Sequence, residues 1–301
     1  MVLEDLLGAE KAERHPIDMV LWGFVVSTIS LFIAFLMSKW LPTYIFPGHI
    51  NAWFLFLTSL ALVQLLNRVL MREEKEMLVD KGTLLGRHTD VIFLYMFMFF
   101  GMIIAVSFWF TVLPYHLVQV LFSDQITEVL RIQSLRTTIV GSLIGTSGMA
   151  VTAMFANKGT MLKLIMLNNL RLLFLFMAFA FVFGAGAILL LTWNAAVVGV
   201  AIGNLIRGMV GATASIFLKT ATYFTGFPIS FFSFFVHGIF EVLGYFVGAI
   251  AGGIFSASIV RRHYRTKHFT RVIMDVGLLL GLAIALIIFG SYIEVYVTPL
   301  L

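Results

Sequence analysis

The chain has 301 residues, of which 60% are hydrophobic and 12% are charged, whereas a soluble domain carries about 25% charged residues. This excess of apolar residues predicts a chain that faces a lipid bilayer and excludes a soluble globular domain. The sequence has no cysteine, which excludes disulfides and thiol chemistry, and its net charge of +5 is typical of basic cytoplasmic loops, so no nucleic-acid partner is expected.

The amino-terminal stretch MVLEDLLGAEKAERHP precedes the first apolar segment. It predicts a short amphipathic helix that ends at Pro16 and lies on the inner membrane surface, and a frayed terminus is the alternative interpretation. No small-residue cleavage site follows the first apolar segment, so we do not expect a cleavable signal peptide.

Several segments are candidates for membrane spans, which need roughly 20 mostly apolar residues. Beside the clear segments, Ala52–Leu66 is shorter but uninterrupted. Two others are ambiguous, because Thr138–Ala156 is rich in glycine, serine and threonine and Ala195–Leu218 contains Asn204 and Arg207. The clear segments are Met19–Met37, Val91–Leu113, Leu170–Leu191, Ile229–Ile259 and Val272–Val297.

Basic loops predict the orientation, because short cytoplasmic loops are rich in lysine and arginine. The loop RRHYRTKHFTR, Arg261–Arg271, has five basic residues and no acid, and Asn67–Asp90 also has five lysines or arginines. If both are cytoplasmic, one ambiguous segment crosses the membrane. We favour Ala195–Leu218, which leaves Pro114–Asn168 as an external or interfacial segment. The sequence thus predicts an all-α, polytopic transmembrane helix bundle of about seven spans in the cell membrane, with the amino terminus cytoplasmic and the carboxyl terminus outside.

The stretch VHGIFEVLGYFVGAIAGG places a histidine and a glutamate inside an apolar segment. An ionisable residue at the centre of a span costs about 3 kcal/mol on insertion scales. His237 and Glu241 are four residues apart and therefore neighbours on one helix face. The glycines of this stretch, and those of the ambiguous segment before it, favour close packing against other helices: Gly238, Gly244, Gly248 and Gly252, with Gly199 and Gly203.

These polar residues have alternative interpretations. His237 and Glu241 either bind each other and lock helix packing, or form a functional pair for a polar substrate or a proton; a metal or catalytic site is the least favoured reading. If the last span is an antiparallel neighbour of this helix, Glu294 lies at the depth of His237 and the three form a polar cluster. Asparagines at span ends are expected to cap helices: Asn168 and Asn169 before the Leu170–Leu191 span, and Asn194 after it.

Three motifs together resemble the stage II sporulation protein M family of membrane proteins. They are NNLRLLFLFMAFAFVFGAGAILLLTWNAAVVGVAIG, FFSFFVHGIFEVLGYFVGAIAGG and IALIIFGSYIEVYVTP. The resemblance places paired asparagines, Asn194, Gly199, a His-Gly-x-x-Glu helix and a late Ile-Glu at matching positions. Two residues depart from the family pattern, Val236 in place of proline and Ala195 in place of glycine. The resemblance covers residues 91–301 and leaves 1–90, with the first hairpin and the charged loop, as an addition like that of the longer archaeal members.

The resemblance implies a component of a membrane complex and no enzyme. Bacterial members of the family act in envelope remodelling and recruit cell-wall hydrolases. We therefore expect a membrane scaffold or remodelling component with no catalytic residues, no cofactor and no metal. Its expected partners are the lipid bilayer, proteins of a membrane complex and further copies of itself. The alternative is a permease or channel-like transporter that uses His237, Glu241 and Glu294. An intramembrane metalloprotease is disfavoured, because HGIFE lacks the second histidine of such sites.

Overall fold

The computed structural model describes residues 17–40, 50–63, 84–132, 150–183, 187–210, 215–260, 262, 264 and 269–298, with the backbone alone at 84–88, 90 and 150–157. The amphipathic helix predicted for residues 1–16 lies outside this described part. So does the charged loop up to residue 83.

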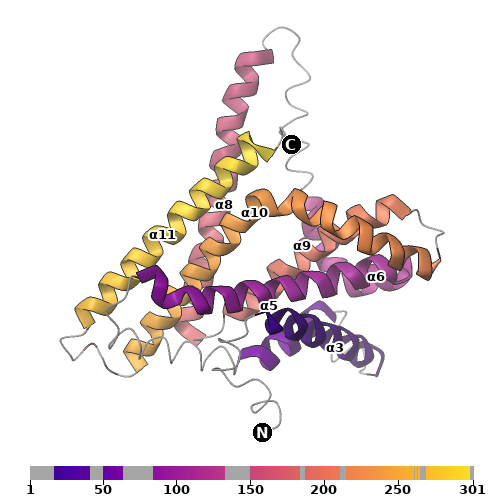
Figure 1. Ribbon diagram of the computed structural model, residues 1–301, viewed down its shortest axis with the longest axis horizontal. Helices are drawn as coiled ribbons and strands as arrows, with labels where there is room; N and C mark the ends of the chain where they lie inside the picture. Colours follow the sequence, from indigo (N-terminus) through magenta and orange to yellow (C-terminus); the bar gives the residue numbers. More distant parts are fainter. Residues whose placement is uncertain are drawn as a thin grey trace.

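The described regular structure is α-helical (Figure 1). The helices follow one another without a strand in the described ranges, in agreement with the prediction of an all-α protein. They are α3 (Asp18–Trp40), a helix over Ile50–Val63, α5 (Leu84–Val112), α6 (Tyr115–Leu121), a helix over residues 123–132, α8 (Ala150–Phe183), α9 (Ala187–Val210), α10 (Ile216–Val260) and α11 (Phe269–Tyr296).

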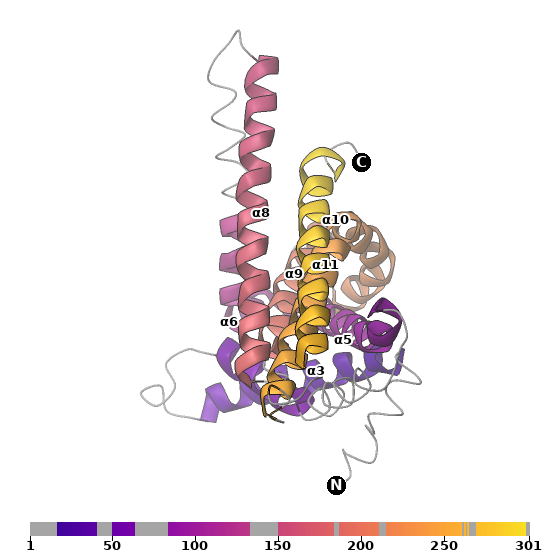
Figure 2. The same ribbon diagram turned by 90° about the vertical axis from the view of Figure 1, so that its left-hand side faces the viewer.

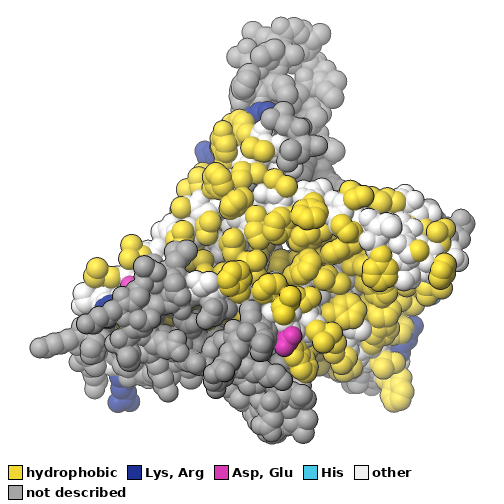
Figure 3. All heavy atoms as spheres, viewed as in Figure 1, with side chains coloured by type: hydrophobic (Ala, Val, Ile, Leu, Met, Phe, Trp, Pro, Cys, Tyr) yellow, Lys and Arg dark blue, Asp and Glu magenta, His cyan; other side chains and the backbone are white. Residues whose placement is uncertain are grey.

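Six of these helices are long and apolar enough to cross a membrane: α3, α5, α8, α9, α10 and α11. The helix Ile50–Val63 is apolar but shorter. Hydrophobic side chains cover most of the described surface in Figure 3, as expected for a protein whose solvent is lipid. The predicted polytopic bundle is confirmed, and the chain is a multi-pass membrane protein.

One predicted span is wrong. Leu170–Leu191 is divided between two helices, because α8 ends at Phe183 and α9 begins at Ala187. The residues between them read Gly-Ala-Gly, and glycine is a poor helix former. The candidate span of α8 therefore begins earlier, at Lys158, and takes in the last part of the predicted external segment 114–168.

The ambiguous segments are also resolved in part. Ala195–Leu218, which we favoured, overlaps the candidate span Ala187–Val210 of α9. Of Thr138–Ala156, residues 150–156 form the first turns of α8, and the rest lies outside the described residues.

Contacts between helices show their relative directions. Gly23 of α3 lies against Gly101 of α5, and Thr28 accepts a hydrogen bond from Trp109, so these helices run parallel. The helix Ile50–Val63 lies between them in sequence. The six candidate spans, together with this shorter apolar helix, are compatible with the prediction of about seven spans.

Helix α10 is the central element of the bundle. Its 45 residues would extend about 68 Å if straight, more than twice the roughly 30 Å of the hydrocarbon core. The helix contains Pro228, and Figure 1 shows it bent, with the first half alongside α5 and the second half passing between α8 and α11. In the second half, the Phe246 ring packs 5.7 Å from both Tyr95 and Phe99 of α5.

Helix α8 extends beyond the rest of the bundle. Figures 1 and 2 both show its amino-terminal part standing clear of the other described helices, beyond the end of α11. Near that end, Tyr292 and Tyr296 of α11 stack at 4.8 Å, and the Lys158 ammonium lies 5.5 Å from the centre of the Tyr296 ring. Tyrosine and lysine are typical of a membrane–water interface, so this level is expected to mark one surface of the bilayer.

Candidate functional site

Glycines of α10 bring its second half close to two neighbouring helices. A Cβ atom at Gly244 would lie 2.8 Å from Ile287 of α11, and one at Gly252 would lie 2.5 Å from the carbonyl oxygen of Met177 in α8. Gly248 faces Leu173 of α8 in the same way. A side chain at Gly252 would meet the backbone of α8 and displace that helix, whereas one at Gly248 would displace the end of the Leu173 side chain.

Two further glycines pack α9 against α5. A Cβ atom at Gly199 would lie 2.8 Å from Val106, and one at Gly203 would lie 3.0 Å from the carbonyl oxygen of Ser107. Gly238 differs from all of these, because no atom of the described residues lies within 4 Å of its Cβ position. The prediction that Gly238 serves helix packing is wrong for the described structure, since its side of α10 is open.

A polar cluster joins three helices at the level where α10 meets α11. The Asn169 amide of α8 donates a hydrogen bond to the Glu241 carboxylate of α10, with 2.6 Å between nitrogen and oxygen. The same nitrogen lies 3.4 Å from the hydroxyl oxygen of Ser291 in α11. Asn169 is 6% exposed and Ser291 is fully buried. A single amide therefore links α8, α10 and α11.

The backbone of α11 permits this approach, because it carries a glycine at the same level. A Cβ atom at Gly290 would lie 2.8 Å from Cγ of Glu241 and 3.2 Å from its backbone nitrogen. Glycine at residue 290 thus leaves room for the stem of the glutamate. Ser291, the next residue, then faces the amide of Asn169.

His237 and Glu294 lie on the same side of the α10–α11 contact. The His237 ring nitrogen Nδ1 is 3.3 Å from the hydroxyl of Thr298, just beyond the end of α11. Glu294 lies one turn after Gly290 and one turn before Thr298, so it shares the face that meets α10. All three predicted residues, His237, Glu241 and Glu294, are half-buried.

The cluster lies within the membrane. Asn169 precedes Phe183, the last residue of the candidate span, by 14 residues, which is about 21 Å along the helix. A hydrocarbon core of roughly 30 Å therefore contains it, nearer the end at which α11 finishes. An amide, a carboxylate and a hydroxyl at this depth can hold helices together or bind a proton or a cation. In the described part of the chain, no three His, Asp or Glu residues are grouped so that they could hold a metal ion.

The asparagines do not lie where the sequence placed them. We predicted Asn168, Asn169 and Asn194 at span ends, and this is wrong, because the first two lie within α8 and the third within α9. Asn194 donates to the carbonyl oxygen of Leu190 in its own helix, at 2.9 Å. Asn168 is exposed and lies 3.4 Å from the side-chain oxygen of Asn169.

A second polar group joins α5, α9 and the first half of α10. The Tyr223 hydroxyl lies 2.9 Å from the Ser107 hydroxyl and donates to the carbonyl oxygen of Ile104 at 3.1 Å. Arg207 donates to the carbonyl oxygens of Phe110 and Leu113, at 2.8 and 3.0 Å. Phe110 lies in the last turn of α5, whose carbonyls have no partner within the helix and favour a cation, and Leu113 directly follows this helix. Arg207 therefore caps α5 and is explained by structure alone.

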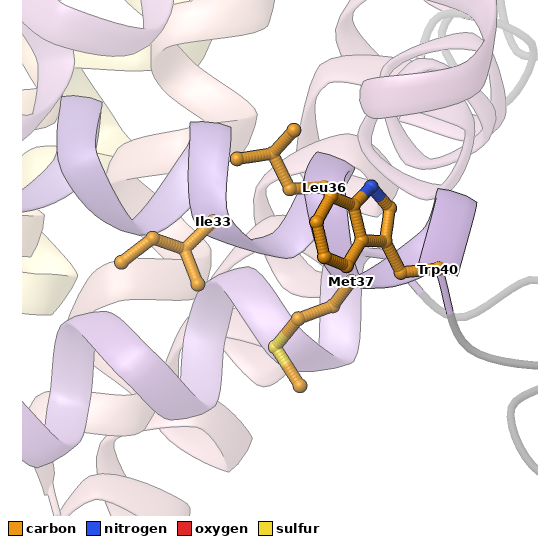
Figure 4. Close-up of a pocket in the computed structure, with 4 residues that line it drawn as sticks. All are labelled: Ile33, Leu36, Met37 and Trp40. Atoms are coloured by element: carbon orange, nitrogen blue, oxygen red, sulfur yellow. The ribbon is translucent and has the colours of Figure 1, made fainter.

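The end of α3 carries a shallow apolar groove (Figure 4). Its lining comes from one helix: Ile33, Leu36, Met37 and Trp40. The Trp40 side chain is 85% exposed, as is common for tryptophan at a membrane–water interface. The groove offers an apolar surface and contains none of the predicted site residues.

Comparison with protein families identifies a match over most of the chain. Residues 91–299 match the family model described as stage II sporulation protein M. No curated protein and no solved structure matches the chain. The matched region begins within α5 and contains the three-helix polar cluster.

Proposed function

This chain belongs to the stage II sporulation protein M family, and on that premise we propose that it is a scaffold of a membrane- or envelope-remodelling complex in the cell membrane. It has no catalytic activity of its own. Its role is to hold partner proteins at the membrane by means of a rigid helix bundle.

The observation that carries this proposal is that the Asn169 side chain contacts two other spans. Its amide contacts Glu241 and Ser291, so polar groups of three spans are directed at one another. Transporters work by rocking one group of helices against another around a site near the bilayer midplane. A buried amide that links α8, α10 and α11 instead favours one fixed arrangement of these helices.

The packing around the cluster supports the same function. Gly244 meets α11, and Gly248 and Gly252 meet α8, all with backbone or side-chain atoms close to the missing Cβ. Tightly apposed helices resist the sliding that opens and closes a pathway. We therefore expect the second half of α10, α8 and α11 to move as one body.

Reconstitution into vesicles separates the scaffold from a transporter. We expect vesicles that contain the wild-type protein to hold a pH gradient as long as protein-free vesicles do. We also expect the native protein to co-purify with a cell-wall or division enzyme, and the Asn169→Ala variant to lose that enzyme. Rapid decay of the gradient with the wild-type protein, prevented by Glu241→Gln, would overturn the scaffold.

The second candidate is a permease or channel-like transporter, which one observation favours. His237, Glu241 and Glu294 are half-buried and lie on the same side of the α10–α11 contact. Ionisable residues so placed are typical of proton or ion pathways. This alternative predicts that His237→Ala and Glu241→Gln both slow the flux of protons or cations while the protein stays folded.

A further inference from the structure

Helix α8 carries a cation on the face that turns away from the bundle. Arg171 follows Asn169 by two residues, which places it roughly 160° around the helix. Asn169 is buried against α10 and α11, whereas Arg171 is exposed. No described residue forms a hydrogen bond or an ion pair with Arg171.

Arg171 lies at the middle of the span. It is 13 residues after Lys158 and 12 before Phe183, the two ends of the candidate span, or about 20 Å from each. In a hydrocarbon core of roughly 30 Å that ends at Phe183, Arg171 is about 18 Å from that end and about 12 Å from the other. An arginine side chain is shorter than either distance, so its guanidinium cannot reach either surface by extending along the helix. A charged side chain at this depth is costly unless it meets a partner.

The residues around Arg171 form an apolar surface. Leu164, Leu167 and Phe174 lie within roughly 60° of it on the helix, and half or more of each side chain is exposed. Asn168, also exposed, adds one amide next to the cation. A single charged group inside an apolar face matches a transmembrane helix that has one opposite charge.

We propose that the outward face of α8, centred on Arg171, binds a transmembrane helix of a different protein that carries a carboxylate at the middle of the bilayer. The carboxylate accepts hydrogen bonds from the guanidinium, and the leucines and Phe174 pack around the pair. This inference deepens the proposed function, because it states where and by what chemistry the scaffold binds a partner.

Two other occupants fit the face less well. A second copy of this chain, bound through the same face by two-fold symmetry, would place Arg171 against Arg171, and like charges repel. A lipid phosphate lies at the membrane surface. Lys163 is the exposed cation that could meet such a phosphate. It lies on the same side of α8 as Arg171 and about 12 Å closer to the amino-terminal end of the helix.

A synthetic peptide tests the proposal directly. A dye-labelled polyleucine helix with one central glutamate is reconstituted with the full protein in phosphatidylcholine vesicles, and energy transfer reports binding. The acceptor dye is attached to Val260→Cys, which is exposed at the end of α10 in a chain without other cysteines. We expect the glutamate peptide to bind about fivefold to tenfold more tightly than the all-leucine peptide, as for other polar pairs in membranes.

Variants of the protein decide which residue is responsible. Arg171→Ala should remove the preference for the glutamate peptide, and Arg171→Glu should transfer it to a peptide with a central lysine. Lys163→Ala is the matched control and should leave the preference unchanged. The melting temperature of Arg171→Ala should equal that of the wild type, since the side chain packs outside the bundle.

Three outcomes would overturn the proposal. They are equal binding of both peptides by the wild-type protein, a preference that survives Arg171→Ala, and self-association of the protein that Arg171→Ala abolishes. None of these outcomes depends on proton flux. A proton flux that overturns the scaffold would therefore not change the measured peptide binding. Likewise, a failure of peptide binding would not change the measured flux.

Discussion

The two halves of α10 pack in different ways, although they belong to one helix. In the second half, glycines place the helix backbone against α8 and α11, and residues 244–254 are almost completely buried. In the first half, aromatic rings make the contacts: Phe227 and Phe231 stack at 5.7 Å, and Phe231 lies 5.0 Å from Phe100 of α5. Backbone contacts leave little room for change, whereas rings can shift. The second half should therefore be far more sensitive to substitution.

Gly252→Ala should have the largest effect. The added Cβ would lie 2.5 Å from the carbonyl oxygen of Met177, a backbone atom that can move only with α8. Overpacking of this kind costs about 1–3 kcal/mol, so we expect the unfolding midpoint in denaturing detergent to fall clearly.

Gly238→Ala is the matched control in the same helix. Within the part of the chain that the structure describes, no atom lies within 4 Å of its Cβ position, and alanine favours a helix over glycine by about 0.5–1 kcal/mol. We expect an unchanged or slightly higher midpoint. Equal losses in both variants would show that the contact of residue 252 with the Met177 carbonyl is not the cause of the loss.

Asn169→Ala should have the next largest effect. The change removes the amide that links Glu241 and Ser291 and leaves both groups inside the bundle. Hydrogen bonds between helices in membranes contribute about 0.6 kcal/mol on average and up to about 1.7, and the carboxylate acceptor favours the upper value. Unfolding of the purified protein in mixed micelles measures the loss.

Asn168→Ala provides the control for this prediction. Asn168 is exposed, and its amide nitrogen lies 3.4 Å from the side-chain oxygen of Asn169. We expect a loss of less than about 0.5 kcal/mol, as is usual for surface substitutions. If Asn168→Ala destabilises the bundle as much as Asn169→Ala, the three-helix link is not the stabilising feature.

The same comparison shows what the sequence can predict. Composition and the lengths of the apolar runs were enough to predict an all-α membrane bundle. The hydrophobic effect determines the composition of such a chain, and the thickness of the bilayer determines the length of each apolar run. The division of Leu170–Leu191 was missed, because hydropathy alone continues through Gly184 and Gly186. Because of that error, Asn169 was predicted at the end of a span, whereas it lies in the interior of one.

The partners of the polar residues needed the structure. Glu241 was recognised as an intramembrane carboxylate, but Asn169 lies 72 residues away in sequence, and no periodicity connects two helices. Tyr223 was missed because tyrosine is common in apolar segments and only its hydroxyl contact marks it. The sequence does contain a signal for Asn169. If the span is taken to begin at Lys158, the pair Asn168–Asn169 stands out as two polar residues inside an apolar helix.

Tyr223→Phe should have the smallest effect and tests the aromatic half of α10. The change removes a hydroxyl that contacts Ser107 and Ile104 of α5 but keeps the ring. A hydrogen bond of this kind contributes about 0.5–1.5 kcal/mol, and we expect the lower end, because the stacked rings remain. A double-mutant cycle with Ser107→Ala should give a coupling free energy in that range.

Tyr95→Phe is the control, because Tyr95 also packs against α10. Its ring lies 5.7 Å from Phe246 of the glycine-packed half, and its buried hydroxyl has no hydrogen-bond partner in the described part of the chain. Removal of a buried hydroxyl without a partner is neutral or stabilising. We therefore expect Tyr223→Phe to lower the unfolding midpoint and Tyr95→Phe to leave it unchanged or raise it. The opposite order would mean that hydroxyl contacts do not hold the first half of α10 to α5, and that ring packing alone does.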